Sequence, residues 1–74
     1  MSMDTLKVTL SSSLSASERD DARAQIEDMS GVLRTAFGDA AKTYIKVAYN
    51  PNCTKTAEKI SRVSGVTSAK YYPY

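Results

Sequence analysis

A three-residue phrase that occurs twice is the feature that most constrains how this chain folds. Ser30-Gly31-Val32 and Ser64-Gly65-Val66 each follow an amphipathic stretch, and each amphipathic stretch follows a run with strand character. Glycine is common where helices end, because it adopts the left-handed backbone conformation without steric cost. The 74 residues therefore predict two consecutive β-α-β units within a single domain, residues 1–74.

Four runs have the pattern of β-strands. Apolar and polar side chains alternate over residues 5–10 and again over Tyr44–Tyr49. Further strands are expected at Val32–Phe37, before a turn that begins at Gly38-Asp39, and at Val66–Tyr72. The apolar residues of the first and third strands that are expected to face the core are Leu6, Val8, Leu10, Ile45, Val47 and Tyr49.

Two helices are predicted between these strands. Ser15 and Glu18 have the spacing of a capping box, so the first helix is expected to begin there, and Gly31 is expected to cap its end. The second helix is expected after the turn Asn50-Pro51-Asn52 and to stop at Gly65. The apolar residues at helical spacing are Ala22, Ile26 and Met29 in the first helix and Ala57, Ile60 and Val63 in the second.

The order of these elements predicts an α+β fold, a ferredoxin-like βαββαβ sandwich. Its four strands are expected to form one antiparallel sheet in the order 4-1-3-2. Each helix has a single apolar stripe, so both helices are expected on one face of the sheet. The other face of the sheet is then left open.

The charge is unevenly distributed along the chain. Residues 1–41 carry four basic and seven acidic side chains, a net charge of −3, whereas residues 42–74 carry six basic and one acidic, a net charge of +5. The net charge of the whole chain is +2, which is too small by itself to indicate nucleic acid. The asymmetry favours a polar surface and a charged partner.

The chain contains one cysteine and no histidine. It therefore has no intramolecular disulfide, and it shows neither a signal segment nor the run of about 18 apolar residues that a membrane span requires. We expect a cytoplasmic domain that does not contact a membrane. Without histidine, and without a visible nucleophile paired with a base, we expect no enzymatic activity and no cofactor.

The second half carries a more specific pattern. Ile45-Lys46-Val47-Ala48-Tyr49-Asn50-Pro51 resembles the third strand and following turn of the heavy-metal-associated domain of copper chaperones and metal-pumping ATPases, and the order of elements matches over almost the whole chain. In that family two cysteines, spaced C-x-x-C between the first strand and the first helix, bind a soft metal. The matching positions here are Ser15 and Glu18, so the resemblance implies a domain that has lost its metal site.

Cys53 is the remaining candidate for metal chemistry. It lies near the predicted start of the second helix, and we expect it at the same end of the sheet as the loop before the first helix. A lone cysteine without a second cysteine or a histidine is predicted to be a small packing residue. A metal-binding, chaperone-like domain that completes its site with Cys53 from two chains stays open as an alternative.

The open face of the sheet is the strongest candidate site. Side-chain alternation predicts that Lys7, Tyr44 and Lys46 face outward there, and Lys70 or Tyr71 is expected to join them from the last strand. We predict a non-enzymatic protein-interaction module that uses this face for a protein partner or for self-association. Basic groups beside aromatic rings on a four-stranded sheet also leave open a nucleic-acid-binding domain.

Overall fold

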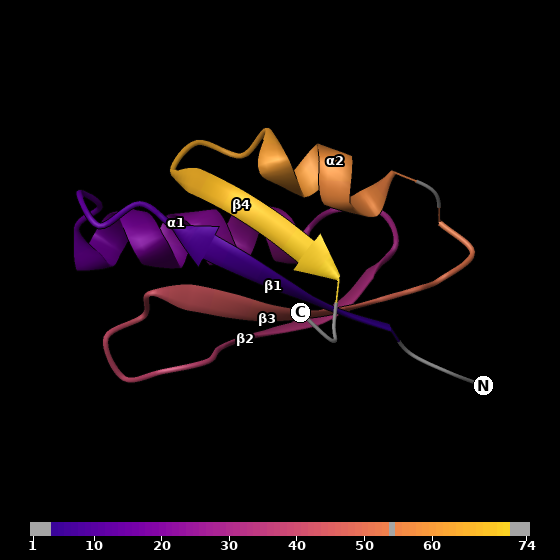
Figure 1. Cartoon of the computed structure of the whole chain (residues 1–74), viewed down its shortest axis with the longest axis horizontal. Coiled ribbons are helices and arrows are strands. Elements are labelled where there is room, and N and C mark those ends of the chain that lie inside the picture. Colours follow the sequence, from indigo (N-terminus) through magenta and orange to yellow (C-terminus); the bar gives the residue numbers. More distant parts are fainter. Residues whose placement is uncertain (1–3, 54, 72–74) are drawn as a thin grey trace.

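The computed structural model describes residues 4–53 and 55–71, and its elements follow the predicted order (Figure 1). Their bounds are β1 Asp4–Leu10, α1 Ala16–Glu27, β2 Val32–Phe37, β3 Tyr44–Tyr49, α2 Thr56–Ser61 and β4 Val66–Tyr71. The prediction of four strands and two helices is confirmed. Tyr72, the last residue predicted for the fourth strand, lies outside the described residues.

The four strands form one antiparallel sheet in the order β2-β3-β1-β4. This is the predicted order 4-1-3-2 read from the opposite edge. The central strands β1 and β3 pair from Asp4↔Tyr49 to Thr9↔Tyr44. Because these two strands run in opposite directions, they end at opposite ends of the sheet.

One face of the sheet is buried against both helices. The buried apolar residues form a single cluster of Leu6, Val8, Leu10, Ala22, Ile26, Ile45, Val47, Tyr49, Ile60 and Val63. The members from β1 and β3 all point to one face, as the alternation predicts. Since residues of α1 and α2 pack in the same cluster, both helices cover that face, with α1 against β2 and α2 against β4. Figure 1 shows α1 behind the sheet.

The first helix begins as predicted and ends earlier. The Glu18 N–H donates to the Ser15 hydroxyl at 3.1 Å, and the Ser15 N–H donates to the Glu18 carboxylate at 2.8 Å, so the capping box is confirmed. The helix ends with Asp28 as its cap, and Met29 is partly buried beyond it. Gly31 therefore lies in the turn that leads into β2 and does not cap the helix.

The second helix is only six residues long. Lys55 precedes it in the left-handed conformation, with φ at 64°, and its side chain makes no capping bond. Thr56 and Ile60 are buried, whereas the predicted Ala57 is partly buried. Val63 is buried as expected, but it lies after the helix has ended.

The two Ser-Gly-Val turns have the same conformation. Gly31 has φ at 93° and Gly65 has φ at 91°, a region that favours glycine. In both turns the N–H of the next valine donates to the carbonyl three residues earlier at 3.1 Å. Each glycine carbonyl also accepts a bond from the other half of the chain, from Asn50 to Gly31 and from Ser11 to Gly65, both at 2.8 Å. The repeated phrase is thus a repeated structure.

This repetition extends to the packing around the glycines. A Cβ atom at Gly65 would lie 2.6 Å from Cδ1 of Leu14, and one at Gly31 would lie 2.8 Å from Cβ of Cys53. Leu14 and Cys53 therefore occupy equivalent positions in the two halves. Each fills the space beneath the turn glycine of the other half.

The two halves are related by an approximate twofold axis perpendicular to the sheet. Ser11 and Asn50 are equivalent by their bonds to the turn glycines, and Lys7 and Lys46 each lie four residues before them. Lys7 is also directly opposite Lys46 in the β1–β3 pair. The axis therefore passes between these two lysines.

Both edge strands carry a bulge at the same place. The register of β2 shifts between Val32 and Arg34, which leaves Leu33 as the extra residue. The register of β4 shifts in the same way around Thr67. A bulge interrupts the alternation of side chains, so the faces of the later residues in β2 and β4 follow from the observed register.

Candidate binding face

Three lysines form a line across the open face: Lys7 of β1 lies directly opposite Lys46 of β3 and, on its other side, opposite Lys70 of β4. We call Lys46, Lys7 and Lys70 the lysine row. Neighbouring strands lie about 4.7–4.9 Å apart, so the row spans about 10 Å between its outer backbones. Lys46 and Lys70 are exposed, and Lys7 is half-buried. The structure thus brings together these residues from three strands.

The side chains around the row are mostly neutral. The other outward-facing residues of the strands are Thr5, Thr9, Arg34, Ala36, Tyr44, Ala48 and Ser68. Within the described ranges, no Asp or Glu occupies an outward-facing position of a strand. Like charges directly opposite each other on a sheet destabilise it by about 0.2–1 kcal/mol. The row therefore gathers positive charge at some cost to the fold.

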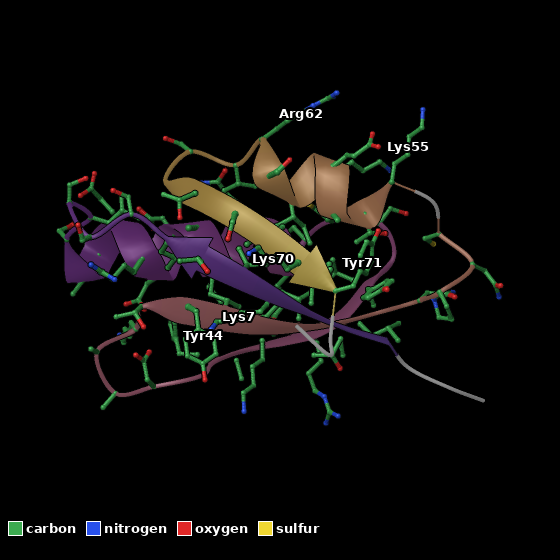
Figure 2. The ribbon with its side chains drawn as sticks, viewed as in Figure 1. Lys7, Tyr44, Lys55, Arg62, Lys70 and Tyr71 are labelled. Atoms are coloured by element: carbon green, nitrogen blue, oxygen red, sulfur yellow. The ribbon has the colours of Figure 1, made fainter. Side chains whose placement is uncertain are left out.

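Tyr44 lies beside the row. The Lys7 ammonium is 4.7 Å from the centre of the Tyr44 ring, which is within the range of a cation–π interaction. The Tyr44 hydroxyl donates to the Gly38 carbonyl at 3.3 Å. Figure 2 shows the Lys7 and Tyr44 side chains close together. These contacts fix the half-buried ring next to the lysine.

Tyr71 lies on the other face of the sheet. It pairs with Leu6, whose side chain points into the core, and its ring centre is 5.7 Å from that of Tyr49. The side chain remains 53% exposed at the end of β4 (Figure 2). Of the two candidates expected from the last strand, Lys70 joins the open face, and the expectation for Tyr71 is wrong.

Arg34 is a member of this face that the sequence pattern did not reveal. It is exposed and pairs with Ala48, so it lies one step along the strands from the lysine row. The small side chains of Ala36 and Ala48 leave an open hollow of about 320 Å³ between Arg34 and Lys46. The extra residue Leu33 shifts the alternation of side chains in β2 by one position, so alternation alone does not place Arg34 outward.

A second hollow, of about 210 Å³, borders the other side of the row. It is lined by Lys7, Thr9, Leu10, Ser12, Arg19, Thr43 and Tyr44. The Arg19 guanidinium in its wall donates to the carbonyls of Leu14 at 3.1 Å, Lys42 at 2.7 Å and Ser12 at 3.4 Å. These bonds tie the loop after β1 to the β2–β3 hairpin, so we assign Arg19 a structural role.

The hairpin between β2 and β3 holds its charged groups internally. The Asp39 carboxylate accepts bonds from the Thr43 hydroxyl and from the Thr43 N–H, and the hydroxyl is the main reason that the pKa of Asp39 is lowered. Lys42, with φ at 58°, places its ammonium 3.0 Å from Asp20 and 5.2 Å from the centre of the Phe37 ring. We therefore do not count this hairpin as part of the candidate face.

The positions that match the metal ligands of the resembled family are used in capping. Ser15 and Glu18 bond to each other through both backbone and side chain. The bond from the Ser15 N–H, followed by that from its hydroxyl, lowers the pKa of Glu18. This carboxylate is therefore held in its charged form by the helix start.

Cys53 lies at the opposite end of the sheet from Ser15, so the expectation that they share one end is wrong. The physical reason is the antiparallel pairing: β1 ends where β3 begins, and Cys53 follows the end of β3. Its side chain packs beneath Gly31. In the part of the chain that the structure describes, no three His, Cys, Asp or Glu residues come together as a metal site would require.

The acidic charge is concentrated on α1. Asp20 pairs with Lys42 at 3.0 Å, and Glu27 pairs with Arg23 at 3.2 Å. Asp21 is exposed on the same helix. The open face of the sheet and α1 thus carry opposite charges on opposite sides of the domain, although Lys7 of the row belongs to the acidic half of the sequence.

No protein-family model matches the chain, and no curated protein matches it. Over residues 4–53 and 55–71, neither helix has the length and apolar character needed to cross a membrane. The geometry of the open face is therefore the basis for a functional proposal.

Proposed function

We propose that this chain is a non-enzymatic protein-interaction module that binds an acidic partner through the open face of its sheet. The observation that carries the proposal is the lysine row. Its ammonium groups come from three adjacent strands, and the outward-facing positions of the described strands hold no Asp or Glu. A surface of this kind attracts negative charge and speeds association with acidic partners at low salt.

The same proposal includes the fold family. The strand order and the two helices on one face agree with a ferredoxin-like sandwich, and the chain resembles a heavy-metal-associated domain without its metal ligands. The capping bonds of Ser15 and Glu18 support a structural role at the positions where that family binds metal. The cytoplasmic location expected from the sequence belongs to this proposal as well.

An acidic protein fits this face better than a nucleic acid does. Sheets that read single-stranded RNA stack two or three bases on aromatic side chains. Among the outward-facing residues of the described strands, Tyr44 is the one aromatic side chain, and its ring is half-buried beneath Lys7. Over the described residues, the face therefore offers charge without a stacking platform of several rings.

Fluorescently labelled poly-glutamate and single-stranded oligo-dT are suitable probes for the whole chain. We expect poly-glutamate to bind at low ionic strength and to weaken as salt approaches about 0.15 M, where the Debye length falls to about 8 Å. Lys7→Glu combined with Lys46→Glu should abolish this binding. The matched control, Lys55→Glu with Arg62→Glu, changes the net charge equally at the two caps of α2, and both side chains point away from the row (Figure 2).

The outcomes separate the alternatives. Circular dichroism of both double variants is the control that tests whether they remain folded. Equal loss in the two variants would show that net charge, and not the row, drives binding, and would overturn the proposal. If the chain binds oligo-dT more tightly than poly-glutamate, and the Lys7→Glu and Lys46→Glu double variant loses this binding, the face is assigned to nucleic acid instead.

A further inference from the structure

The lysine row runs across the strands and not along them. Each of its members comes from a different strand, and they lie side by side in the registers Lys7↔Lys46 and Lys7↔Lys70. The outward-facing neighbours one step along β1, Thr5 and Thr9, are uncharged. An acidic chain that follows one strand therefore meets one lysine, whereas a chain that crosses the strands meets all three.

The edges of the sheet are poorly suited to adding a partner strand. Leu33 in β2 and Thr67 in β4 are the extra residues of bulges, and bulges at edge strands obstruct further pairing. A strand added at either edge would also lie parallel or antiparallel to the sheet strands, next to one end of the row only. This geometry disfavours recognition by strand addition.

We infer that the lysine row binds an acidic α-helix of a partner protein, laid across the strands with its carboxylates along one face. The inference rests on the proposed function and specifies the form of the partner. Adjacent members of the row are about 4.8 Å apart. Residues at i, i+3 and i+4 on a helix are about 5–6 Å apart, and seven residues rise about 10.5 Å, which matches the span of the row.

An extended partner matches the row less well. Side chains on one face of a β-strand repeat every two residues, about 6.6–6.8 Å, so three of them span about 13 Å. The helix therefore places its acidic groups closer to the spacing of the row. Arg34 lies beyond the Lys46 end and one step along the strands, where it can meet a further carboxylate of a helix that crosses obliquely.

The test uses three synthetic peptides of equal composition with the whole chain. In the first, glutamates at i, i+4 and i+7 lie on one helical face; in the second, they are spread around the helix; in the third, they alternate with β-branched residues. At low ionic strength, we expect the Kd of the first peptide to be lower than that of the others by about fivefold or more, because the first peptide forms several surface ion pairs at once. Lys70→Glu should remove this preference, whereas Lys59→Glu on the exposed side of α2 should not.

The failure of this inference is distinct from the failure of the proposed function. Equal affinity for the three peptides, with poly-glutamate binding intact, overturns the helix and leaves the acidic partner standing. Loss of binding to all acidic probes overturns both. Self-association of the chain at low salt, with no binding to any peptide, would overturn the inference that the helix belongs to a different protein. It would indicate that the face binds the acidic α1 of a second copy of this chain.

Discussion

Replacing Lys46 by glutamate is expected to stabilise the folded chain while it abolishes binding to acidic partners. Lys46 is exposed and lies directly opposite Lys7, so the variant replaces a like-charge pair by an opposite-charge pair. On its other side Lys46 faces Ala36, which does not change the balance of charge. The variant therefore tests the electrostatic cost of the Lys7–Lys46 pair.

The size of the effect follows from the register. Two unit charges about 6 Å apart in water interact by about 0.7 kcal/mol, and salt at about 0.1 M reduces this to about 0.4 kcal/mol. Exchange of repulsion for attraction doubles the difference, and the freedom of exposed side chains lowers it again, which leaves about 0.5 kcal/mol, within the measured range for cross-strand pairs. For a domain of this size, about 0.5 kcal/mol corresponds to a rise in Tm of about 2–4 °C.

Thermal unfolding followed by circular dichroism, at low and at high salt, measures this directly. Lys46→Gln removes the repulsion without adding attraction, so its Tm should lie between those of the wild type and Lys46→Glu. The differences should shrink at high salt. A lower Tm for Lys46→Glu, or a ranking that salt does not change, would refute the argument that the row is held against its own repulsion.

Three further predictions concern the fold. Gly31→Ala should lose about 1–2 kcal/mol or more, because its φ of 93° is strained for alanine and its Cβ would lie 2.8 Å from Cβ and 2.9 Å from Sγ of Cys53. In urea unfolding, the double variant with Cys53→Ala should recover no more than part of this loss, because it removes Sγ but keeps Cβ and the strained φ. Ile26→Ala, at a site with 0% exposure, should lose about 2–5 kcal/mol and leave the chain largely unfolded by circular dichroism, whereas Ile26→Val should lose about 0.5–1.5 kcal/mol and stay folded. Because the pKa of Glu18 is lowered in the folded state by its bonds to Ser15, its contribution is present above the ordinary glutamate pKa and is lost as the pH falls through the lowered value; Glu18→Gln, which keeps the capping spacing, should flatten acid unfolding curves in that range, and an unchanged curve would contradict this.

The sequence was sufficient for the central part of the fold. In β1 and β3 the strict alternation around Val8 and Val47 predicted the buried face, because both strands are regular and buried on one side only. The capping box at Ser15 predicted the start of α1 for a local reason, since its bonds join residues three positions apart. Local and periodic signals of this kind do not depend on the rest of the fold.

The edge strands and the short helix were less predictable. The bulges at Leu33 and Thr67 insert a residue that no periodicity records, and they therefore obscured the outward position of Arg34 and the inward position of Tyr71. The start of α2 depends on a left-handed Lys55 without a side-chain cap, so it leaves no capping signal in the sequence. The end of the sheet at which Cys53 lies follows from the predicted antiparallel order, because β3 ends where β1 begins.

The sequence predicts only part of the lysine row. Parity placed Lys7 and Lys46 on the open face, but their direct opposition depends on the register between β1 and β3. Register between strands distant in sequence is set by long-range packing, which a single sequence does not display. The line formed with Lys70 is therefore a property of the assembled sheet.

A helix bound across the row meets the same two central ammonium groups whichever way its N-terminus points, because the twofold axis exchanges Lys7 with Lys46. The outer positions break this degeneracy. Lys70 and Ala36 each lie five residues after a turn glycine and are equivalent, so in line with the two central lysines β4 carries a charge and β2 does not. The direction in which a docked helix points is thus decided by the side chains of the edge strands, and removing the Lys70 charge should allow the helix to bind in both directions.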